Sequence, residues 1–303
     1  MAVEYLLAID GGGTKTVARL INNNTGEEYH ACAGPASVSN DINLAIENIA
    51  SLVNELCRQS RACHSQMLAV MGLAGGSSTQ LAEQVSQTLT LQFEIKFASL
   101  YIVSDAVTSL YGANLGESCA VVALGTGAVG ARLNENAEVK LISGWGFAVD
   151  DFGGGARLGL HAVQHLLDDI DYYDGAKSQL TKKLSEHIGE CRTDIAQWLK
   201  KAKPDDYARF SPLIFSLQKR CHVAQQVLAE HGKHVELLIR KSRTSAALPV
   251  ILIGGLAKVT CELLAPSIVN ELSPCKGDSL TGAAILAAKY YNDSIEKGQN
   301  NEP

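Results

Sequence analysis

Short, continuously apolar runs alternate along this chain with longer stretches whose apolar residues recur every three or four positions. Residues 6–9 and 67–71 are runs of the first kind, which is typical of strands buried on both faces of a sheet. Residues 42–60 show the second pattern and follow Asp41, whose carboxylate suits the N-cap of a helix. The alternation of the two patterns predicts an α/β fold.

The predicted elements occur in the same order twice. Two or three strands in a meander, followed by a helix, a strand, a helix and a strand, describe a ribonuclease-H-like domain. We expect one such domain over 1–113, joined by the last helix at 283–295, and a second over 114–282 with a helical insertion at 155–232, leaving 296–303 as a disordered tail. Strands are expected at 17–21, 27–33, 100–103, 120–124, 128–133 and 249–253, and helices at 79–89, 259–272 and 278–291.

A glycine-rich turn, DGGGTKT at 10–16, ends the first apolar run. Glycine tolerates the positive φ values that sharp turns need, and without side chains the main-chain amides can approach an anion closely. Thr14 and Thr16 add hydroxyl donors, and Asp10 could hold a hydrated metal ion. A second turn, Gly-Thr-Gly at 125–127, also follows an apolar run. Each turn alone could be an ordinary hairpin, but the repetition predicts a duplicated domain with one phosphate-binding hairpin in each half.

Composition excludes several classes of protein. The chain has 303 residues, 46% of them hydrophobic, which is enough to bury two cores, and a net charge of -6 argues against a nucleic-acid surface. No apolar stretch is long enough for a membrane span, and the N-terminus lacks the basic lead-in of a secretory signal. Eight cysteines are scattered without a CxxC pair, which predicts neither a zinc site nor disulfides and is typical of a cytoplasmic protein.

Two further motifs indicate little by themselves. His161 and His165 are four residues apart on a predicted helix, as in a metal-binding pair, but no glutamate follows the first histidine as zinc proteases require. We therefore expect a structural or surface role for both. No GK[ST] sequence occurs, so the chain is not a P-loop kinase.

Six motifs in order carry a resemblance to a known family. The chain resembles the N-acetylglucosamine kinase and glucosamine kinase group of the BadF/BadG/BcrA/BcrD branch of the sugar kinase/Hsp70/actin superfamily, from about residue 6 to 288. The resemblance implies two actin-like ATPase domains that close an interdomain cleft around ATP, Mg2+ and a small-molecule amino sugar, with the sugar 6-phosphate as product and a homodimer as one candidate assembly. The motifs are DGGGTKT at 10–16, GLAGG at 72–76, SDA at 104–106, LGTGA at 124–128, GWGFAVDDFGGGARLG at 144–159 and IGGLAK at 253–258.

The chemistry of phosphoryl transfer assigns roles to these motifs, because such an enzyme must orient a nucleophile and neutralise charge. Asp105 is the expected catalytic base for the sugar hydroxyl, and a helix N-cap is its alternative role. Asp10 is expected to order Mg2+ through water. By resemblance, Gly254 and Gly255 pass beneath the adenosine, although a strand-to-helix turn would also explain them. The nucleotide-binding set is Asp10, Gly11, Gly12, Gly13, Thr14, Lys15, Gly125, Thr126, Gly127, Gly254 and Gly255.

On the sugar side, the resemblance implies that Asp151 binds sugar hydroxyls and that Trp145 borders the ring. Asp150 could share the role of Asp151, a solvated turn could explain either carboxylate, and core packing could explain Trp145. The glycines at 153–155 lead into a helix whose N-terminus could face an anion, or they serve as a flexible link. The substrate-binding set is Ser37, Asn40, Gly75, Asp105, Ala128, Trp145, Gly146 and Asp151.

Two departures from the family pattern bear on which hexosamine is preferred. Where many relatives have a sugar-contacting asparagine, this chain offers Ser37, Ser39 or Asn40. Where relatives that recognise the N-acetyl sugar can carry Ser-Asn, it has Ala128 and Val129. An apolar wall formed by these two residues would suit an acetamide, whereas a free amine would favour a carboxylate. We therefore expect N-acetylglucosamine as substrate, with glucosamine as the alternative.

Two other functions are compatible with parts of the pattern. Redox-linked activators of 2-hydroxyacyl-CoA dehydratases belong to the same branch and carry a cluster-binding cysteine close before the second Gly-Thr-Gly turn. Here Ala123 and Leu124 precede that turn, and Cys119 lies a strand-length earlier. Sugar-sensing repressors use this fold with a helix-turn-helix, for which we expect no room before the first strand. The sequence therefore favours the kinase.

Overall fold

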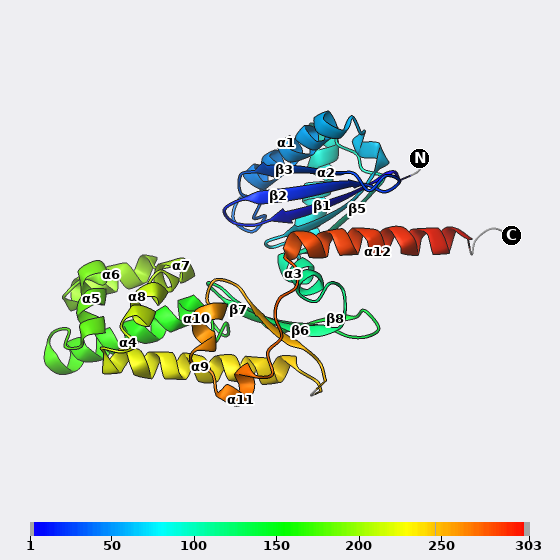
Figure 1. The fold of residues 1–303 in the computed structure, drawn as a ribbon. Helices are drawn as coiled ribbons and strands as arrows, with labels where there is room; N and C mark the ends of the chain where they lie inside the picture. Colours follow the sequence, from blue (N-terminus) through cyan, green and yellow to red (C-terminus); the bar gives the residue numbers. More distant parts are fainter. Residues whose placement is uncertain (1–2, 246, 300–303) are drawn as a thin grey trace. The chain divides into compact units, whose positions relative to one another are not determined.

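The computed structural model describes residues 3–245 and 247–299, which form two compact units (Figure 1). The first unit combines the described residues up to Ser118 with those from Cys275 onward, and the second comprises Cys119–Pro274. The boundaries expected from the sequence were 113/114 and 282/283. Cys275–Asp278 belong with the first unit because Lys276 N–H donates to the carbonyl of Ala113 over 2.9 Å and α12 (Ser279–Gln299) packs along α3 (Asp105–Ala113).

The first unit is built on a five-stranded sheet in the order β3-β2-β1-β4-β5. The three N-terminal strands form the predicted antiparallel meander, and β4 and β5 continue the sheet parallel to β1. This is the ribonuclease-H-like order that the sequence predicts. The strands are β1 (Tyr5–Gly11), β2 (Thr16–Asn22), β3 (Glu28–Ala33), β4 (Met67–Leu73) and β5 (Ser99–Ser104).

Helices cover both faces of this sheet, which explains why its central strands are continuously apolar (Figure 1). On one face, α1 (Ile42–Ser60) and α2 (Thr79–Gln92) share a core with β1 and β4. On the other face, α3 and α12 pack against β1 and β4. Asp41 caps α1 as predicted, because its carboxylate accepts the N–H of Leu44 over 3.1 Å. A short 3-10 helix, η1 (His64–Gln66), leads into β4.

The second unit has a four-stranded sheet in the order β8-β7-β6-β9. This sheet repeats the antiparallel meander and the first parallel strand of the other sheet. Outside the named strands, Leu272 forms an isolated parallel β-bridge with Val250. The strands are β6 (Cys119–Leu124), β7 (Ala128–Leu133), β8 (Val139–Ser143) and β9 (Val250–Ile253). The α/β fold with two related halves is therefore confirmed.

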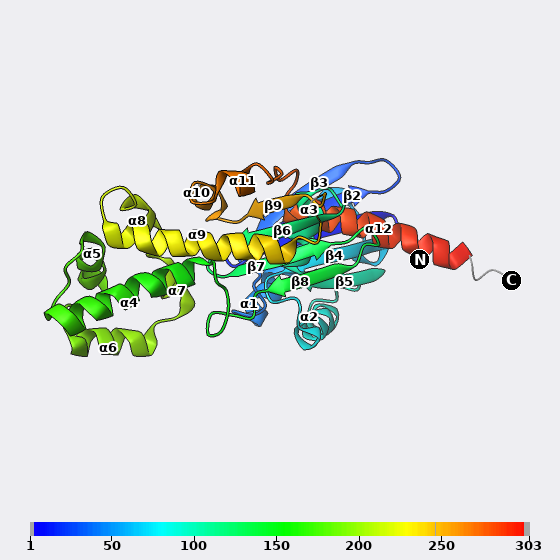
Figure 2. The same cartoon turned by 90° about the horizontal axis from the view of Figure 1, so that it is seen from below.

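The helical insertion begins at Gly155, as predicted, but its last helix continues to Ser242 rather than ending near residue 232. Figure 2 shows this helix, α9, running from the insertion along the sheet, where Val235 and Leu238 join the core of β6. The other helices of the insertion enclose a separate core with the first half of α9. The insertion comprises α4 (Gly155–Tyr173), α5 (Gln179–Ile188), α6 (Arg192–Lys201), α7 (Pro204–Ala208), α8 (Ser211–Ser216) and α9 (His222–Ser242).

Two elements differ from the sequence-based expectations. The single helix expected over 259–272 is instead α10 (Ala257–Cys261) and α11 (Pro266–Val269), because Pro266 forces Ala265 into an extended conformation. The disordered tail expected from residue 296 begins later, since α12 continues to Gln299, and residues 300–303 lie outside the described part. Among the helices of the described residues, none has the length and apolar character of a membrane span.

Candidate active site

The carboxyl ends of β1, β4 and β5 gather several predicted site residues at one edge of the first sheet. The strands are parallel, so their ends meet there. Asp10 is level with Gly72, and Ser104 is level with Leu73, so that Asp105 follows directly beyond the edge. The chain therefore brings Asp10 and Asp105 to the same end of the sheet.

A chain of hydroxyl groups connects these two aspartates. Ser279, the first residue of α12, donates its hydroxyl to Asp10 Oδ1 over 2.9 Å. The hydroxyl of Thr108 lies 2.7 Å from Ser279 Oγ and 3.1 Å from the main-chain oxygen of Asp105. Gly72 makes room for Thr108, since a Cβ at Gly72 would lie 2.2 Å from its Oγ1. One hydrogen-bond network within the first unit thus links the carboxylate of Asp10 to the main chain of Asp105.

Burial raises the pKa of both carboxyl groups. For Asp10, desolvation is the largest cause; the hydrogen bond from Ser279 and the charge of Lys15 lower the pKa, while the charges of Asp105 and Asp278 raise it further. For Asp105, desolvation again outweighs the hydrogen bonds from backbone amides, including that of Ala106. A carboxylate with a raised pKa is a stronger proton acceptor, which is the property that a general base needs.

Helix capping explains part of the position of Asp105, but not all of it. Ser104 is the N-cap of α3, and Asp105 is the first helical residue, whose Oδ1 accepts the N–H of Ala106 over 2.9 Å. A carboxylate in the first turn is favoured by the helix dipole. However, the pKa of Asp105 is raised, because burial destabilises the ionised carboxylate by more than these hydrogen bonds stabilise it.

The glycine-rich turn between β1 and β2 differs from its expected conformation. No glycine from Gly11 to Gly13 has a positive φ, so the conformational reason inferred from the sequence is wrong. Gly11 is required by packing, because a Cβ there would lie 2.6 Å from Leu73 Cδ2. A Cβ at Gly13 would meet no described atom within 4 Å, so the protein fold leaves that space open.

Some of the hydroxyl and amine groups of this turn are exposed to a ligand, and one is buried. Thr14 and Lys15 are exposed. The expectation that Thr16 donates its hydroxyl to a ligand is wrong, because Thr16 is buried and donates that hydroxyl to the carbonyl of Gly34 over 2.7 Å. The main-chain bond from Gly12 N–H to Lys15 O, at 3.1 Å, closes the turn. The exposed surface of the turn therefore consists of glycine backbone, Thr14 and Lys15.

The three candidates for the missing asparagine lie in one loop beside Gly75. Ser37 is buried, and its hydroxyl lies 3.1 Å from that of Ser39, whereas Asn40 is exposed. Gly75 has a φ of 86°, and a Cβ there would lie 2.8 Å from Ser39 Cβ. Val38 N–H donates to Ala74 O over 3.0 Å and ties the two loops together. The fold thus gathers this loop and Gly75 at the edge that carries Asp10 and Asp105.

In the second unit, the turn between β6 and β7 supports the start of α4. Gly155 N–H donates to Gly125 O and Ala156 N–H donates to Thr126 O, both over 2.8 Å. The sequence suggested that the N-terminus of this helix could face an anion, but these two amides already donate to main-chain carbonyls. Gly154 is required by packing, since a Cβ there would lie 2.6 Å from the carbonyl carbon of Gly127. A Cβ at Gly125, in contrast, would meet no described atom within 4 Å.

Thr126, the hydroxyl assigned to the second phosphate hairpin, already has an acidic partner. Its Oγ1 donates to Asp205 Oδ1, in α7, over 3.0 Å. Both residues are exposed, so the contact lies in solvent. Phosphate and this carboxylate are both acceptors for the one hydroxyl hydrogen of Thr126, which makes the Asp205 contact a competitor of phosphate binding.

The adjacent carboxylates Asp150 and Asp151 have different environments. Burial raises the pKa of Asp150, but hydrogen bonds from Ser143 Oγ, at 2.6 and 2.7 Å, and from the amides of Trp145 and neighbouring residues bring it below its ordinary value. Asp150 therefore holds the loop at 144–154 in shape. The pKa of Asp151 is raised, chiefly by burial.

The carboxylate of Asp151 is next to the second glycine turn. A Cβ at Gly127 would lie 2.6 Å from Asp151 Oδ2, and Gly146 N–H donates to Oδ1 over 3.3 Å. Asp151 itself has a φ of 60°, a strained conformation for a non-glycine residue. Trp145 is 83% exposed, so the alternative that it packs in the core is wrong. The second unit thus brings together Gly127, Trp145, Gly146 and Asp151.

The remaining predicted residues of the second unit lie at the ends of β7 and β9. Gly254 has a φ of 94°, and a Cβ there would lie 2.4 Å from Leu124 O, so a tight turn explains this glycine. Gly255 is exposed, and a Cβ there would meet no described atom within 4 Å. Ala128 is only 3% exposed and packs in the core with Val235, so its side chain contributes to the interior of the unit.

Sequence reasoning missed four residues that shape these sites. Ser279 and Thr108 are separated from Asp10 by much of the chain, and nothing in the sequence pairs them. Asp278 had a local signal, because it begins a predicted helix and is followed by Thr281, whose N–H and hydroxyl donate to its Oδ1. Asp205 belongs to a short helix whose approach to Thr126 depends on the packing of the insertion.

A comparison with models of protein families finds a match that spans all six sequence motifs. The family model described as the BadF/BadG/BcrA/BcrD ATPase family matches residues 7–284. The chain belongs to this ATPase family. Membership implies the use of ATP, in agreement with the sequence-based expectation.

Three known proteins are similar to this chain over almost its whole length. Glucosamine kinase GspK of Vibrio cholerae is 27% identical over 98% of this chain and 100% of its own length. The N-acetyl-D-glucosamine kinase of Dictyostelium discoideum is 24% identical over 95% of this chain and 98% of its own. A crystal structure from Chromobacterium violaceum, of a protein proposed to be an N-acetylglucosamine kinase, is 29% identical, covers 94% of this chain and 99% of its own, and superposes with a TM-score of 0.82.

Proposed function

We propose that this member of the ATPase family is an amino sugar kinase that transfers the γ-phosphate of ATP to the 6-hydroxyl of N-acetylglucosamine. The observation that carries the proposal is the connection of Asp10 and Asp105 through Ser279 and Thr108 at the carboxyl edge of the first sheet. One carboxylate of this pair suits a metal–phosphate ligand and the other suits a hydroxyl nucleophile.

The residues around Asp10 fit a magnesium–nucleotide. Magnesium usually keeps several waters and takes one or two carboxylates, so a single half-buried aspartate is a suitable anchor. The open space at Gly13 and the exposed ammonium of Lys15 suit phosphate oxygens at the same turn. When bound, Mg–ATP supplies the phosphoryl group and neutralises charge on it.

Asp105 is the proposed base. Its carboxylate accepts the proton of the sugar hydroxyl while the oxygen–phosphorus bond forms and the bond from the γ-phosphorus to the ADP oxygen breaks. The raised pKa supports this role, because it brings the basicity of the carboxylate closer to that required near neutral pH. Thr108 positions Asp105 by contacting its main-chain oxygen.

The loop at 144–154 is the proposed sugar-binding element of the second unit. Asp151 would accept hydrogen bonds from ring hydroxyls, and the exposed indole of Trp145 would lie against the apolar face of the sugar. Val149, which is 71% exposed, offers an apolar contact to an acetamide in place of the buried Ala128.

Glucosamine is a second candidate substrate, and a specific observation favours it. The apolar wall expected from Ala128 is turned into the core, whereas the carboxylate of Asp151 remains partly accessible and would attract a free ammonium group. The similarity to glucosamine kinase GspK supports the same alternative. The two sugars differ in charge at position 2, so direct comparison separates them.

The deciding experiment measures ADP release with N-acetylglucosamine, glucosamine, N-acetylmannosamine, N-acetylmuramic acid and glucose, and locates the phosphate on the product by phosphorus NMR. The expected result is the highest kcat/KM with N-acetylglucosamine and phosphate on O6. A higher kcat/KM with glucosamine would replace the first candidate by the second. ADP release that no sugar stimulates would overturn the proposal of a sugar kinase.

The assignment of Asp105 has its own test. Asp105→Asn is expected to reduce turnover by about 10²–10⁴-fold while ATP and sugar binding are retained. Asp41→Asn is the matched control, since it makes the same chemical change at another helix start of the same unit, where asparagine also caps well. Near-normal turnover of Asp105→Asn would show that Asp105 is not the base.

A further inference from the structure

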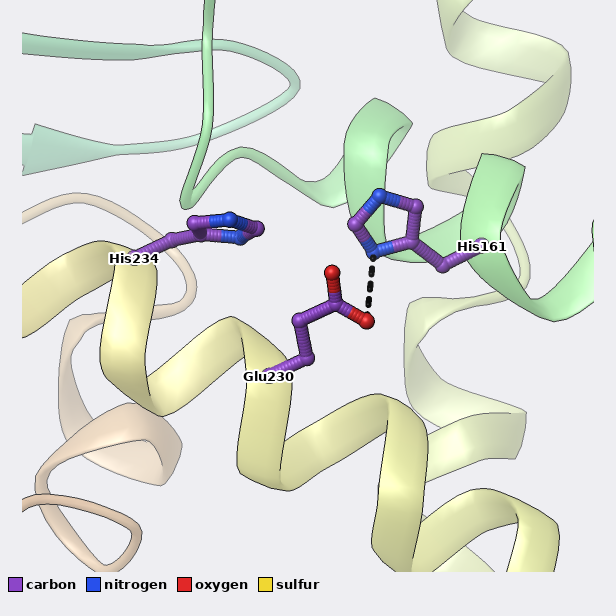
Figure 3. Close-up of side chains that lie close together, drawn as sticks. All are labelled: His161, Glu230 and His234. Atoms are coloured by element: carbon purple, nitrogen blue, oxygen red, sulfur yellow. Dashed lines mark ion pairs between the residues drawn. The ribbon is translucent and has the colours of Figure 1, made fainter.

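Three metal-ligating side chains meet between two helices of the second unit (Figure 3). His161 comes from α4, and Glu230 and His234 come from α9. Nδ1 of His161 lies 3.9 Å from Glu230 Oε2, and one ligand atom from each of the three residues lies within 4.8 Å of the others. Glu230 and His234 are one turn apart on α9, so both project from the same face of the helix toward α4.

The two imidazoles are suited to bind a cation rather than a proton. Burial lowers the pKa of both His161 and His234, and the charge of Glu230 raises each pKa. Arg157 lowers the pKa of both imidazoles, and His161 also lowers that of His234. His165 also contributes to the lowering at His161. A neutral imidazole keeps a free lone pair at neutral pH, and this is the form in which histidine binds a metal.

We propose that His161, Glu230 and His234 form a binding site for a divalent cation of the zinc class. Two nitrogens and one carboxylate oxygen are a donor set that zinc accepts and magnesium does not favour. Tetrahedral zinc needs its ligand atoms about 3.3 Å apart, so the three atoms, which lie within 4.8 Å of one another, must close by at most about 1.5 Å. Rotation of the exposed side chain of Glu230 shortens its distances to both imidazoles, rotation of the half-buried imidazole rings shortens the distance between them, and the fourth position is left for water.

The charges around the site limit its affinity without excluding a cation. Arg157 is a positive group that lowers the pKa of both imidazoles, but its guanidinium stacks on Phe147 and Phe152, and its Nε donates to Asp150 O over 2.8 Å, which holds its charge beside the loop. His231, on α9 between Glu230 and His234, has its pKa lowered to about 4 by burial, and its Nε2 is hydrogen-bonded to the hydroxyl of Thr260. It therefore adds no charge at neutral pH. Glu230 supplies the negative charge that favours a cation.

The proposed metal site lies next to the loop at 144–154. The ring of His234 lies 5.0 Å from that of Phe152, which belongs to the loop at 144–154. His234, Phe152 and Asp150 also line a cavity of about 220 Å³. A cation bridging α4 and α9 would therefore reduce the mobility of the helix pair on which this loop rests.

Sequence spacing alone raised a different pair, His161 and His165 on one helix, for which the sequence analysis expected a structural or surface role. The structure joins His161 instead to residues about seventy positions further along the chain, because α4 and α9 pack side by side. The two arrangements make opposite predictions for His165 and His234. That difference provides the internal control for the experiment.

The experiment uses the tag-free protein and Zn2+ titrated in a calorimeter, with Co2+ as a spectroscopic probe. The expected result is one Zn2+ per chain, a raised melting temperature, and Co2+ bands of low symmetry without the intense near-ultraviolet absorption of thiolate ligation. His234→Ala and Glu230→Gln should each weaken Zn2+ binding at least tenfold, whereas His165→Ala and the exposed His222→Ala should leave it unchanged.

Three outcomes would overturn the site. One is an absence of Zn2+ binding by the native protein, and another is equal affinity in His234→Ala. The third is thiolate absorption with Co2+, which would assign the binding to cysteine side chains. Because Glu230 is exposed, Glu230→Gln tests the ligand without disturbing the core, and circular dichroism in metal-free buffer checks that every variant is folded. None of these measurements depends on kinase activity.

Discussion

Ser279 donates its hydroxyl to the carboxylate of Asp10 over 2.9 Å, although 269 residues separate them in the chain. The bond attaches the first residue of the last helix to the strand that begins the fold, so α12 is part of the candidate nucleotide site. The same hydroxyl lies 2.7 Å from Thr108, which extends the connection to Asp105. The pKa of Asp10 therefore depends on Ser279, a residue that the sequence motifs do not include.

Removal of this hydroxyl is expected to weaken the metal–nucleotide site. The Ser279 bond lowers the pKa of Asp10, so Ser279→Ala should raise that pKa further. Since the ionised carboxylate is the form that orders the cation, the acidic limb of the kcat/KM profile for Mg–ATP should move to higher pH, and KM for Mg–ATP should rise several-fold.

The control for this variant is Ser294→Ala on the same helix, where the exposed hydroxyl donates only to Tyr291 O among its described partners. It should leave the pH profile unchanged. An unshifted acidic limb in Ser279→Ala, with normal KM, would mean that the serine serves only the packing of α12.

Asp105→Asn is expected to stabilise the protein while it inactivates the enzyme. The folded-state pKa of Asp105 is raised above the unfolded value of 3.8, so the ionised carboxylate destabilises the fold at neutral pH. This penalty is present above the folded pKa and is relieved as the pH falls toward 3.8, because the native protein then takes up the proton. The neutral amide should therefore add about 0.5–2 kcal/mol to the free energy of unfolding at pH 7.

Thermal unfolding measured across pH checks the sign of this effect. The stabilisation of Asp105→Asn relative to the native protein should shrink as the pH is lowered. A stabilisation that is independent of pH would locate its cause in something other than the ionisation of Asp105.

The three glycines after Asp10 are expected to respond differently to alanine. Gly11→Ala places a methyl group 2.6 Å from Leu73 and 3.0 Å from Ala36, which should cost about 1–3 kcal/mol of stability. Gly13→Ala meets no described atom and has no positive φ to strain, so its stability should be unchanged, while KM for ATP rises. Chemical denaturation and steady-state kinetics of both variants separate the effects, and unchanged ATP kinetics in Gly13→Ala would exclude the phosphates from that space.

Trp145→Ala is expected to act on sugar binding alone. The side chain is 83% exposed, so its removal should change stability by less than about 0.5 kcal/mol, whereas loss of the stacking surface should raise KM for the sugar. Tyr172→Ala, at an aromatic side chain that is 79% exposed on α4, is the matched control. If both variants keep the native KM, the indole does not contact the sugar.

Much of the fold could be predicted because its causes are local. Runs such as 67–71 are apolar on both faces and have only one suitable environment, a central strand, and Asp41 caps the helix that follows it whatever the tertiary structure. The duplicated strand–glycine turn–strand pattern led from there to two related sheets. The same logic failed at 259–272, where the apolar spacing suggested one helix and the local effect of Pro266 divides it.

The candidate site was predictable only as far as its residues lie in motifs. Asp10, Asp105 and Asp151 carry their chemistry in short segments, and parallel strands deliver the first two to one edge of a sheet. By contrast, the role of Asp150 as the anchor of its loop appears only in its bonds to Ser143 and Trp145. Residue type indicated two equivalent carboxylates, and their surroundings made them different.

The sequence by itself determined the order of the elements, the class of fold and the candidate residues for phosphate binding, because backbone preference and side-chain chemistry act within a few residues. The tertiary structure decided which distant groups meet: Ser279 with Asp10, Asp205 with Thr126, and His161 with His234. These contacts depend on how α12, α7 and α9 pack, and packing arises from the whole set of buried surfaces rather than from any one segment.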